Sequence, residues 1–189
     1  HLPFIDFRAY KIGNHIPTEM LPSAEYVYEY VMEKDGEEHR FETYPTDPSY
    51  KFVAMNHLNP EAAPKITDFG VWNDEGDFTE AVFEGNKLFV ILYDVSKADR
   101  ESIEDINDLV KALGNNIEIY ALTASDGAAF EQFQTETGLN IPYYYTDATV
   151  LKTIVRSNPG LWLMKNGTVQ GKWHHNDVPN YSQVLDLVK

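Results

Sequence analysis

The sequence of 189 residues contains no cysteine. Thiol–disulfide exchange needs a thiolate nucleophile, so no residue of this chain can carry out that reaction. The absence of cysteine also excludes disulfide cross-links and thiolate metal sites, but it assigns the chain to neither an oxidising nor a reducing compartment. Any chemistry of this chain therefore depends on other side chains.

Basic residues and long apolar runs are also scarce. The chain has 15 Lys and Arg residues against 30 Asp and Glu residues, which gives a formal net charge of −15. Because nucleic acids and anionic membrane surfaces are bound mainly through Lys and Arg, this balance predicts no nucleic-acid partner and disfavours electrostatic docking on a membrane. The longest apolar run, residues 88–93, has the length of a strand, whereas a membrane helix needs about 20 residues.

Apolar residues make up 43% of the chain and aromatic residues 13%, which is typical of a globular protein. Residues 1–22 are rich in proline and glycine and are predicted to be a lead-in or linker. Residues 23–60 are predicted to form a β-hairpin extension, because two alternating runs flank Asp35-Gly36, a favoured hairpin turn. Residues 61–189 are predicted to form the main domain.

Strand and helix patterns alternate from residue 88 onward. The expected strands are residues 88–93, 117–122, 143–145, 161–164 and 168–173. The first expected helix starts at a capping-box-like Ser96, has an apolar face over residues 103–113 and stops at Gly114. The other expected helices are residues 128–137, 149–156 and 181–188. Such alternation indicates an α/β fold with a mainly parallel central sheet and helices on both faces. The dipeptide Asn166-Gly167 predicts a closing hairpin, which adds an antiparallel edge.

Three local features resemble a known fold family. Lys65–Val71 is similar to an entry strand, Asn158–Met164 stands where the family has a cis-proline before a strand, and residues 165–173 are similar to a closing hairpin. The family is the thioredoxin-like superfamily, and the resemblance is strongest to its branch of membrane-associated thiol–disulfide proteins and peroxiredoxins. Residues 126–145 match the extra strand and helix of that branch. The resemblance covers residues 60–189 and implies a thioredoxin-like three-layer sandwich.

The resemblance also locates the paired-cysteine motif of the family. It would lie just after the strand that ends at Tyr93, and Lys97 and Arg100 stand about where the two cysteines would be. The degenerate motif comprises Ser96, Lys97, Ala98, Asp99 and Arg100. Ser96 is predicted to cap the following helix and lacks an activating base. We therefore expect no catalytic residue here.

A second part of the family's site is the segment Asn158, Pro159 and Gly160. In active relatives, the backbone edge next to the cis-proline pairs with a substrate peptide. The resemblance thus implies a possible peptide-binding edge at these residues, which would hold a peptide by strand addition. The alternative is a structural turn proline that positions the strand beginning at Gly160.

Two further groups of side chains have a functional and a structural interpretation. His174, His175 and Asp177 are weak candidates for a metal site, but adjacent strand residues point to opposite faces, which favours a polar strand end. We therefore expect neither a metal nor a cofactor. Tyr26, Tyr28 and Tyr30 would share one face of the first strand, either as a binding surface or as cover for the core.

Residues 2–13 resemble the stretch that follows the membrane helices in DoxX-type bacterial membrane proteins, some of which end in a thioredoxin-like domain. The sequence begins at His1 without a signal-peptide pattern, so we expect a processed product or a part of a longer protein. The resemblance implies a bacterial protein anchored in a membrane, with this part in the periplasm.

These observations favour a redox-inactive, non-catalytic thioredoxin-like domain that binds a protein or peptide or assists a membrane domain. The competing hypothesis is a metal-dependent or other non-redox enzyme that uses His174, His175 and Asp177. A third possibility is a mainly structural role in support of the preceding membrane domain or of an oligomer.

Overall fold

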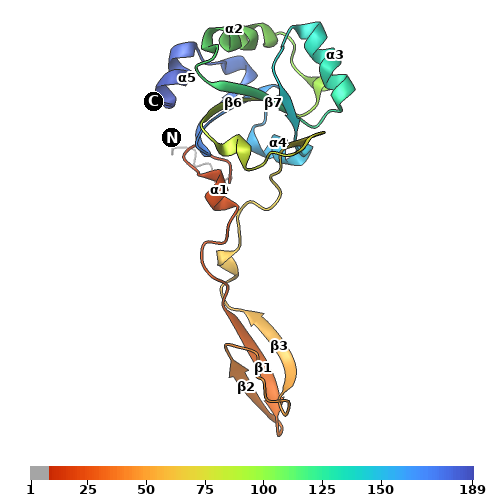
Figure 1. The fold of residues 1–189 in the computed structure, drawn as a ribbon, viewed down its shortest axis with the longest axis vertical. Coiled ribbons are helices and arrows are strands. Elements are labelled where there is room, and N and C mark those ends of the chain that lie inside the picture. The colour runs from red at the N-terminus through yellow and green to blue at the C-terminus, as the bar shows by residue number, and fades with distance from the viewer. Residues whose placement is uncertain (1–8) are drawn as a thin grey trace, which may run out of the picture. The chain divides into compact units, whose positions relative to one another are not determined.

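The computed structural model describes residues 9–189, which form two compact units (Figure 1). Residues 18–65 form one, called here the three-stranded unit. Residues 9–17 and 66–189 form the other, called the α/β unit. No helix among residues 9–189 combines the length and the apolar character that crossing a membrane requires. The predicted domain division and its membrane connection stay predictions.

The three-stranded unit is an antiparallel sheet with the order β2-β1-β3. Its strands are β1 (Tyr28–Lys34), β2 (Glu37–Phe41) and β3 (Lys51–His57). Asp35 and Gly36 join β1 to β2 with φ angles of 54° and 80°. Two positive φ angles define the hairpin turn that an Asp-Gly pair favours, so the local prediction of a hairpin is confirmed.

The α/β unit contains a seven-stranded sheet with the order β10-β9-β6-β7-β8-β4-β5. Its strands are β4 (Trp72–Asn73), β5 (Gly76–Asp77), β6 (Asn86–Leu92), β7 (Glu118–Thr123), β8 (Tyr143–Tyr145), β9 (Gly160–Lys165) and β10 (Thr168–His174). Only β6, β7 and β8 run parallel to one another. The strands β9, β10, β4 and β5 are added by antiparallel pairing.

The prediction of a mainly parallel sheet is therefore wrong. The reason lies in the connection through α4 (Ala148–Ile154), which leads from β8 to β9. Because β9 runs antiparallel to β6, the chain enters β9 at the edge where β8 ends. The strand–helix–strand order in the sequence fits a parallel crossover equally well, so the order alone does not fix the direction of β9.

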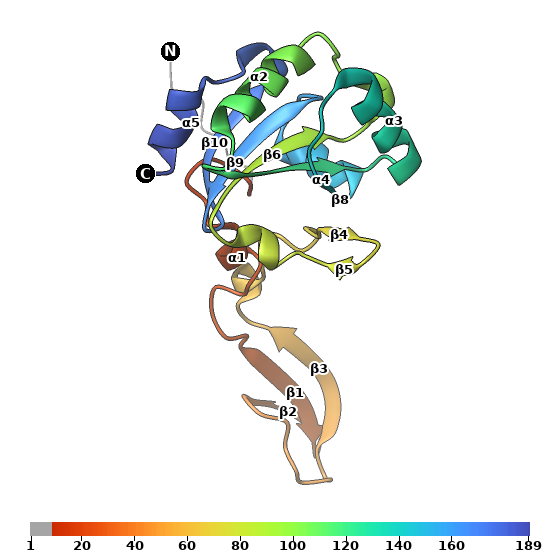
Figure 2. The same cartoon turned by 45° about the horizontal axis from the view of Figure 1, so that its top comes forward.

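Helices cover both faces of this sheet. On one face lie α2 (Ile103–Leu113), α3 (Gly127–Thr137) and α5 (Tyr181–Leu187), whereas α4 lies on the other face (Figures 1 and 2). The main core cluster lies between α2, α3 and α5 on one side and β6 and β9 on the other. Its buried members include Leu88, Ile106, Phe130, Leu161 and Val184. This layering positions the loops that follow β6 and precede β9 at one edge of the sheet.

The opposite face of the sheet is aromatic and includes the start of the described chain. The Trp162 ring lies 5.6 Å from Phe89 and 6.1 Å from Tyr10, measured between centroids. The backbone N–H of Gly13 donates to the Val169 carbonyl at 2.8 Å. Residues 9–17, expected to be a linker, thus pack on the α/β unit, and they continue into the short helix α1 (Ile16–Glu19).

The entry strand implied by the resemblance at Lys65–Val71 is not formed. The short strand β4 begins only after this segment, at Trp72, and the backbone N–H of Val71 donates to the Thr79 hydroxyl at 3.0 Å. Side-chain hydrogen bonds of this kind replace a strand ladder, so the segment is a loop that leads into β4.

Candidate functional site

The loop of residues 94–100 follows β6 and contains the positions where the paired-cysteine motif was expected; we call it the Asp94–Arg100 loop. It begins with a 3₁₀ turn at Val95–Lys97. The Asp94 carboxylate accepts hydrogen bonds from the Ser96 backbone N–H at 2.9 Å and from the Ser96 hydroxyl at 2.6 Å. Hydrogen bonding by Ser96 lowers the pKa of the Asp94 carboxyl group.

The sequence predicted that Ser96 caps the following helix α2, and this prediction is wrong. The N-terminal neighbour of α2 is Ser102, whose backbone N–H donates to Asp99 Oδ2 at 3.0 Å. Hydrogen bonding by Ser102 lowers the pKa of the Asp99 carboxyl group. The Asp94–Arg100 loop is thus held by two carboxylates, each of which accepts from a serine a few residues downstream.

Two hydrogen bonds join the Asp94–Arg100 loop to the segment around the proline. The backbone N–H of Asp99 donates to the Asn158 carbonyl at 2.8 Å, and Asn158 Nδ2 donates to the Asp94 carbonyl at 2.7 Å. The Asn158–Pro159 peptide bond is cis, as the family resemblance implied. Residues that lie far apart in the sequence therefore meet at one edge of the sheet, where the resemblance placed them.

The segment expected to bind a peptide is covered in this structure. Asn158, Pro159 and Gly160 are buried. Ser157 is buried too; its hydroxyl donates to the Pro159 carbonyl at 2.6 Å and accepts from the His175 backbone N–H at 2.9 Å. A peptide that paired with Asn158 would have to share or displace the bond from Asp99. The peptide-binding role of this edge stays a prediction.

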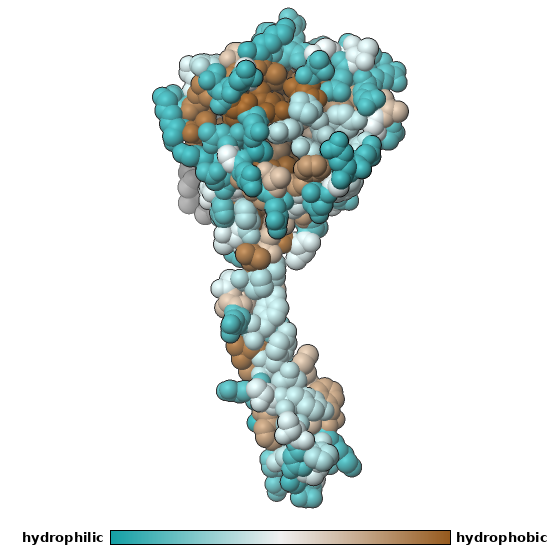
Figure 3. All heavy atoms as spheres, in the orientation of Figure 1, coloured by the Kyte–Doolittle hydropathy of each residue, from teal (hydrophilic) through white to brown (hydrophobic). Residues whose placement is uncertain are grey.

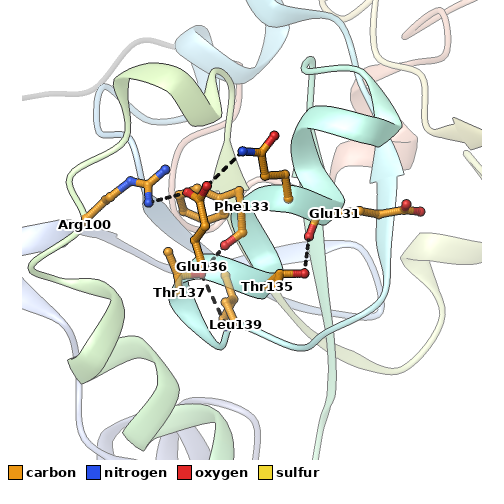
Figure 4. Close-up of polar contacts among 8 residues, drawn as sticks. Arg100, Glu131, Phe133, Thr135, Glu136, Thr137 and Leu139 are labelled. Atoms are coloured by element: carbon orange, nitrogen blue, oxygen red, sulfur yellow. Dashed lines mark hydrogen bonds and ion pairs between the residues drawn. The ribbon is translucent and has the colours of Figure 1, made fainter.

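Arg100, at the second cysteine position, is bound to α3. Its Nη1 atom lies 2.7 Å from Glu136 Oε2, and its guanidinium lies 5.3 Å from the centroid of the Phe133 ring. Figure 4 shows the Arg100 side chain directed at Glu136, which also accepts from Gln132 at 2.9 Å. Hydrogen bonding by Arg100 lowers the pKa of the Glu136 carboxyl group. This position is a structural contact between the loop and the helix.

Lys97, at the first cysteine position, is exposed and borders an open pocket of about 490 Å³. The pocket has charges of both signs, contributed by Asp94, Lys97, Asp126 and Lys152. Lys152 Nζ lies 5.2 Å from the centroid of the Tyr93 ring. The pocket has no uniform charge that would select an anion or a cation.

Two of the three candidate metal ligands come together, because β10 ends at His174 and His175 begins a 3₁₀ turn instead of continuing the strand to the opposite face. The rings of His174 and His175 lie side by side, with centroids 4.1 Å apart. His174 Nδ1 accepts from the Asn176 backbone N–H at 3.2 Å, and His175 Nδ1 lies 3.4 Å from Asp99 Oδ2. Across residues 9–189 there is no group of three or more His, Asp or Glu side chains with the arrangement of a metal site.

Sequence reasoning missed the partners of the expected site residues. Glu136, Ser157 and the side-chain amide of Asn158 all contact the site or its neighbours. Each lies on a different segment from its partner or is paired through the backbone, so no spacing in the sequence signals the contact. Only the family resemblance, which brings the loop and the proline segment together, pointed in this direction.

No family model matches this chain, and no curated protein does. Among solved structures, a thiol-disulfide oxidoreductase from Bacteroides fragilis matches with a TM-score of 0.50 at 13% identity, covering 64% of this chain and 96% of that structure. A secreted disulfide oxidoreductase from Mycobacterium tuberculosis has a TM-score of 0.41 at 12% identity, covering 63% of this chain and 96% of that structure. The first likeness shows the fold alone: the α/β unit has a thioredoxin-like fold, in a chain that contains no cysteine.

Proposed function

We propose that the α/β unit is a non-catalytic thioredoxin-like domain that binds a protein or assists an attached membrane domain. The observation that carries the proposal is the state of the Asp94–Arg100 loop. One expected cysteine position is occupied by Arg100, which is paired with Glu136 at 2.7 Å, and the loop is bonded to Asn158 from both ends. The positions of the redox pair thus serve packing and hydrogen bonding.

The side chains that remain in the loop are poorly suited to nucleophilic catalysis. A serine nucleophile is activated by an adjacent general base within hydrogen-bond reach. The partner of the Ser96 hydroxyl is the Asp94 carboxylate at 2.6 Å, whose lowered pKa makes it a weak base. The half-buried His175 lies against Asp99, and Ser157 accepts from its backbone N–H. This arrangement supports a structural role for the loop.

An insulin-reduction assay tests the absence of redox activity. The turbidity of insulin in dithiothreitol is followed with the purified chain, with no protein, and with a thioredoxin that has both cysteines. We expect the chain to give the rate of the protein-free sample. A reproducible acceleration by this cysteine-free chain would overturn the proposal, because it would require a reductive mechanism that uses other groups.

The membrane connection is the second part of the proposal. It is supported by the resemblance of residues 2–13 to DoxX-type proteins. Residues 2–8 of this stretch lie outside the described residues. We expect the complete gene product to fractionate with membranes and to place this domain in the periplasm. Protease treatment of intact and opened cells determines on which side of the membrane the domain lies. Full recovery of the complete protein in the soluble fraction would contradict the connection.

An assisting role predicts that the membrane part needs this domain. The matched comparison is the complete protein against a version that ends before residue 66. Lower abundance or altered oligomeric state of the shortened version in detergent would support assistance. Unchanged abundance and assembly would leave partner binding as the remaining role.

A further inference from the structure

One face of the three-stranded unit is formed by aromatic and methionine side chains, and we call it the aromatic face. Because successive strand residues alternate between faces, Tyr30 shares a face with Phe41 and Met55, which lie directly opposite it on the two neighbouring strands. Phe52 lies opposite Met32 on the same face. The Tyr44 ring extends this face, with its centroid 5.6 Å from Tyr30 and 6.4 Å from Phe52.

The aromatic face has too little cover within its own unit. Tyr44 is 57% exposed, Phe52 is 55% exposed and Met55 is 52% exposed. The buried residues of this unit are Val31, Met32 and Ala62. Figure 3 shows brown and tan atoms at the surface of this unit among teal ones. Large apolar side chains gathered on one exposed sheet face are typical of a surface that binds a partner.

The net charge of the whole sheet and its loops limits the chemistry of the partner, although Glu29, Glu33 and Glu38 alternate with the residues of the aromatic face and lie on the other side. Residues 28–57 contain seven acidic and three basic side chains. Two of the basic ones are already paired, Arg40 with Glu29 at 2.7 Å and Lys34 with Asp47 at 3.5 Å. A second copy of this acidic sheet would be repelled, as would nucleic acid or an anionic lipid surface. The excess negative charge of the sheet attracts a partner that carries positive charge.

We propose that the aromatic face docks a polypeptide segment of a partner protein that combines apolar and basic side chains. Aromatic residues and methionine are enriched at the centres of protein interfaces, and flexible Met side chains adapt to varied apolar partners. Here they would bury the apolar side chains of the segment, while the excess negative charge of the sheet and its loops attracts its Lys or Arg residues. The inference extends the proposed binding role and uses no residue of the Asp94–Arg100 loop.

The test uses the complete chain and a fluorescein-labelled synthetic peptide of alternating leucine and lysine. Fluorescence anisotropy measures the affinity, and peptides of leucine and glutamate or of lysine alone are the controls. We expect binding only of the leucine–lysine peptide, with an affinity that falls as salt is added. The double variant Phe52→Ser/Met55→Ser should bind at least about tenfold more weakly.

A matched control keeps the result interpretable. Leu187 is 40% exposed on α5 of the α/β unit, so Leu187→Ser removes exposed apolar surface elsewhere and should leave the affinity unchanged. Circular dichroism establishes that each variant is folded. Equal binding by the Phe52→Ser/Met55→Ser variant, or by the leucine–glutamate peptide, would overturn the proposal.

Two other occupants of the face would also overturn it. If a second copy covers the aromatic face, sedimentation analysis would show a dimer of the unmodified chain. The Phe52→Ser/Met55→Ser variant would then be a monomer. Binding of phosphatidylcholine vesicles that depends on the same two residues would indicate a lipid surface. Neither outcome changes the insulin-reduction result, so this inference and the proposed absence of catalysis fail independently.

Discussion

The backbone N–H of Asp99 donates to the carbonyl oxygen of Asn158 at 2.8 Å. This bond connects the loop after β6 to the segment before β9. The family resemblance implied that these two elements meet at one edge of the sheet. The Asn158 side chain adds a second bond, to the Asp94 carbonyl at 2.7 Å. The edge is therefore a closed junction, whose strength can be measured by substitution.

Replacing Asn158 should destabilise the α/β unit. Asn158 is 7% exposed, and Asn158→Ala leaves the Asp94 carbonyl without its donor, so we expect a loss of about 1–3 kcal/mol in the free energy of unfolding. Urea denaturation measures the change. The exposed Asn56, which donates to Glu29 at 3.2 Å, provides the control: Asn56→Ala should change stability by no more than about 0.5 kcal/mol. Equal effects of the two substitutions would contradict the junction.

The Arg100–Glu136 pair should contribute little to stability in spite of its short distance. The two side chains are 52% and 40% exposed, so solvent screens their attraction. A double-mutant cycle with Arg100→Ala and Glu136→Ala should give a coupling energy below about 1 kcal/mol. The stability loss of Arg100→Ala alone does not measure the ion pair, because this substitution also removes the contact with Phe133. A coupling energy of several kcal/mol would contradict this prediction.

Acid should destabilise the chain through the carboxylates of the site. The folded-state pKa of Asp94 is lowered by hydrogen bonding from Ser96, so this group contributes stability at pH above its unfolded value of about 3.9. That contribution is lost as the pH falls through the folded-state value, because the unfolded chain then binds more protons. In urea titrations at several pH values, Asp94→Asn should show a shallower decline of stability below about pH 4 than the unmodified chain. Identical slopes would argue against a titrating role for Asp94.

Tyr10 should be essential to the aromatic layer beneath the sheet. It is 3% exposed, and its ring lies 6.1 Å from both Phe69 and Trp162. Truncating a large buried aromatic side chain removes apolar burial and leaves a cavity, so Tyr10→Ala should cost about 3–5 kcal/mol. Ile12 lies two residues away and is 59% exposed, so Ile12→Ala should have little effect. If both variants unfold at the same urea concentration as the parent, residues 9–17 contribute no packing.

The elements that could be predicted from the sequence are those fixed by local chemistry. Asn166 and Gly167 have φ angles of 48° and 81°, and they form the closing hairpin as predicted. The expected strand at 143–145 matches β8, because a short aromatic run between turn residues is itself a local signal. The apolar face of residues 103–113 was also predicted from its spacing, but the helix begins at Ile103 and not after Ser96 as predicted.

The features that were missed depend on contacts between distant residues. Tyr10 lies in a segment rich in proline and glycine, and only its contact with Trp162 gives that segment a place in the core. The direction of β9 depends on the end of the sheet at which the chain returns to it after α4. The pairing of Arg100 with Glu136 spans separate elements, and surface charges offer many such pairs. The family resemblance supplied the meeting of loop and proline, which periodicity does not contain.

The distribution of tryptophan gives the two units different optical signatures. Trp72, Trp162 and Trp173 all belong to the α/β unit, and Trp162 is fully buried beside three other aromatic rings. Residues 18–65 contain tyrosine and no tryptophan. Emission excited selectively at tryptophan therefore reports unfolding of the α/β unit alone, while the tyrosine-rich sheet must be followed by another signal, such as near-ultraviolet dichroism.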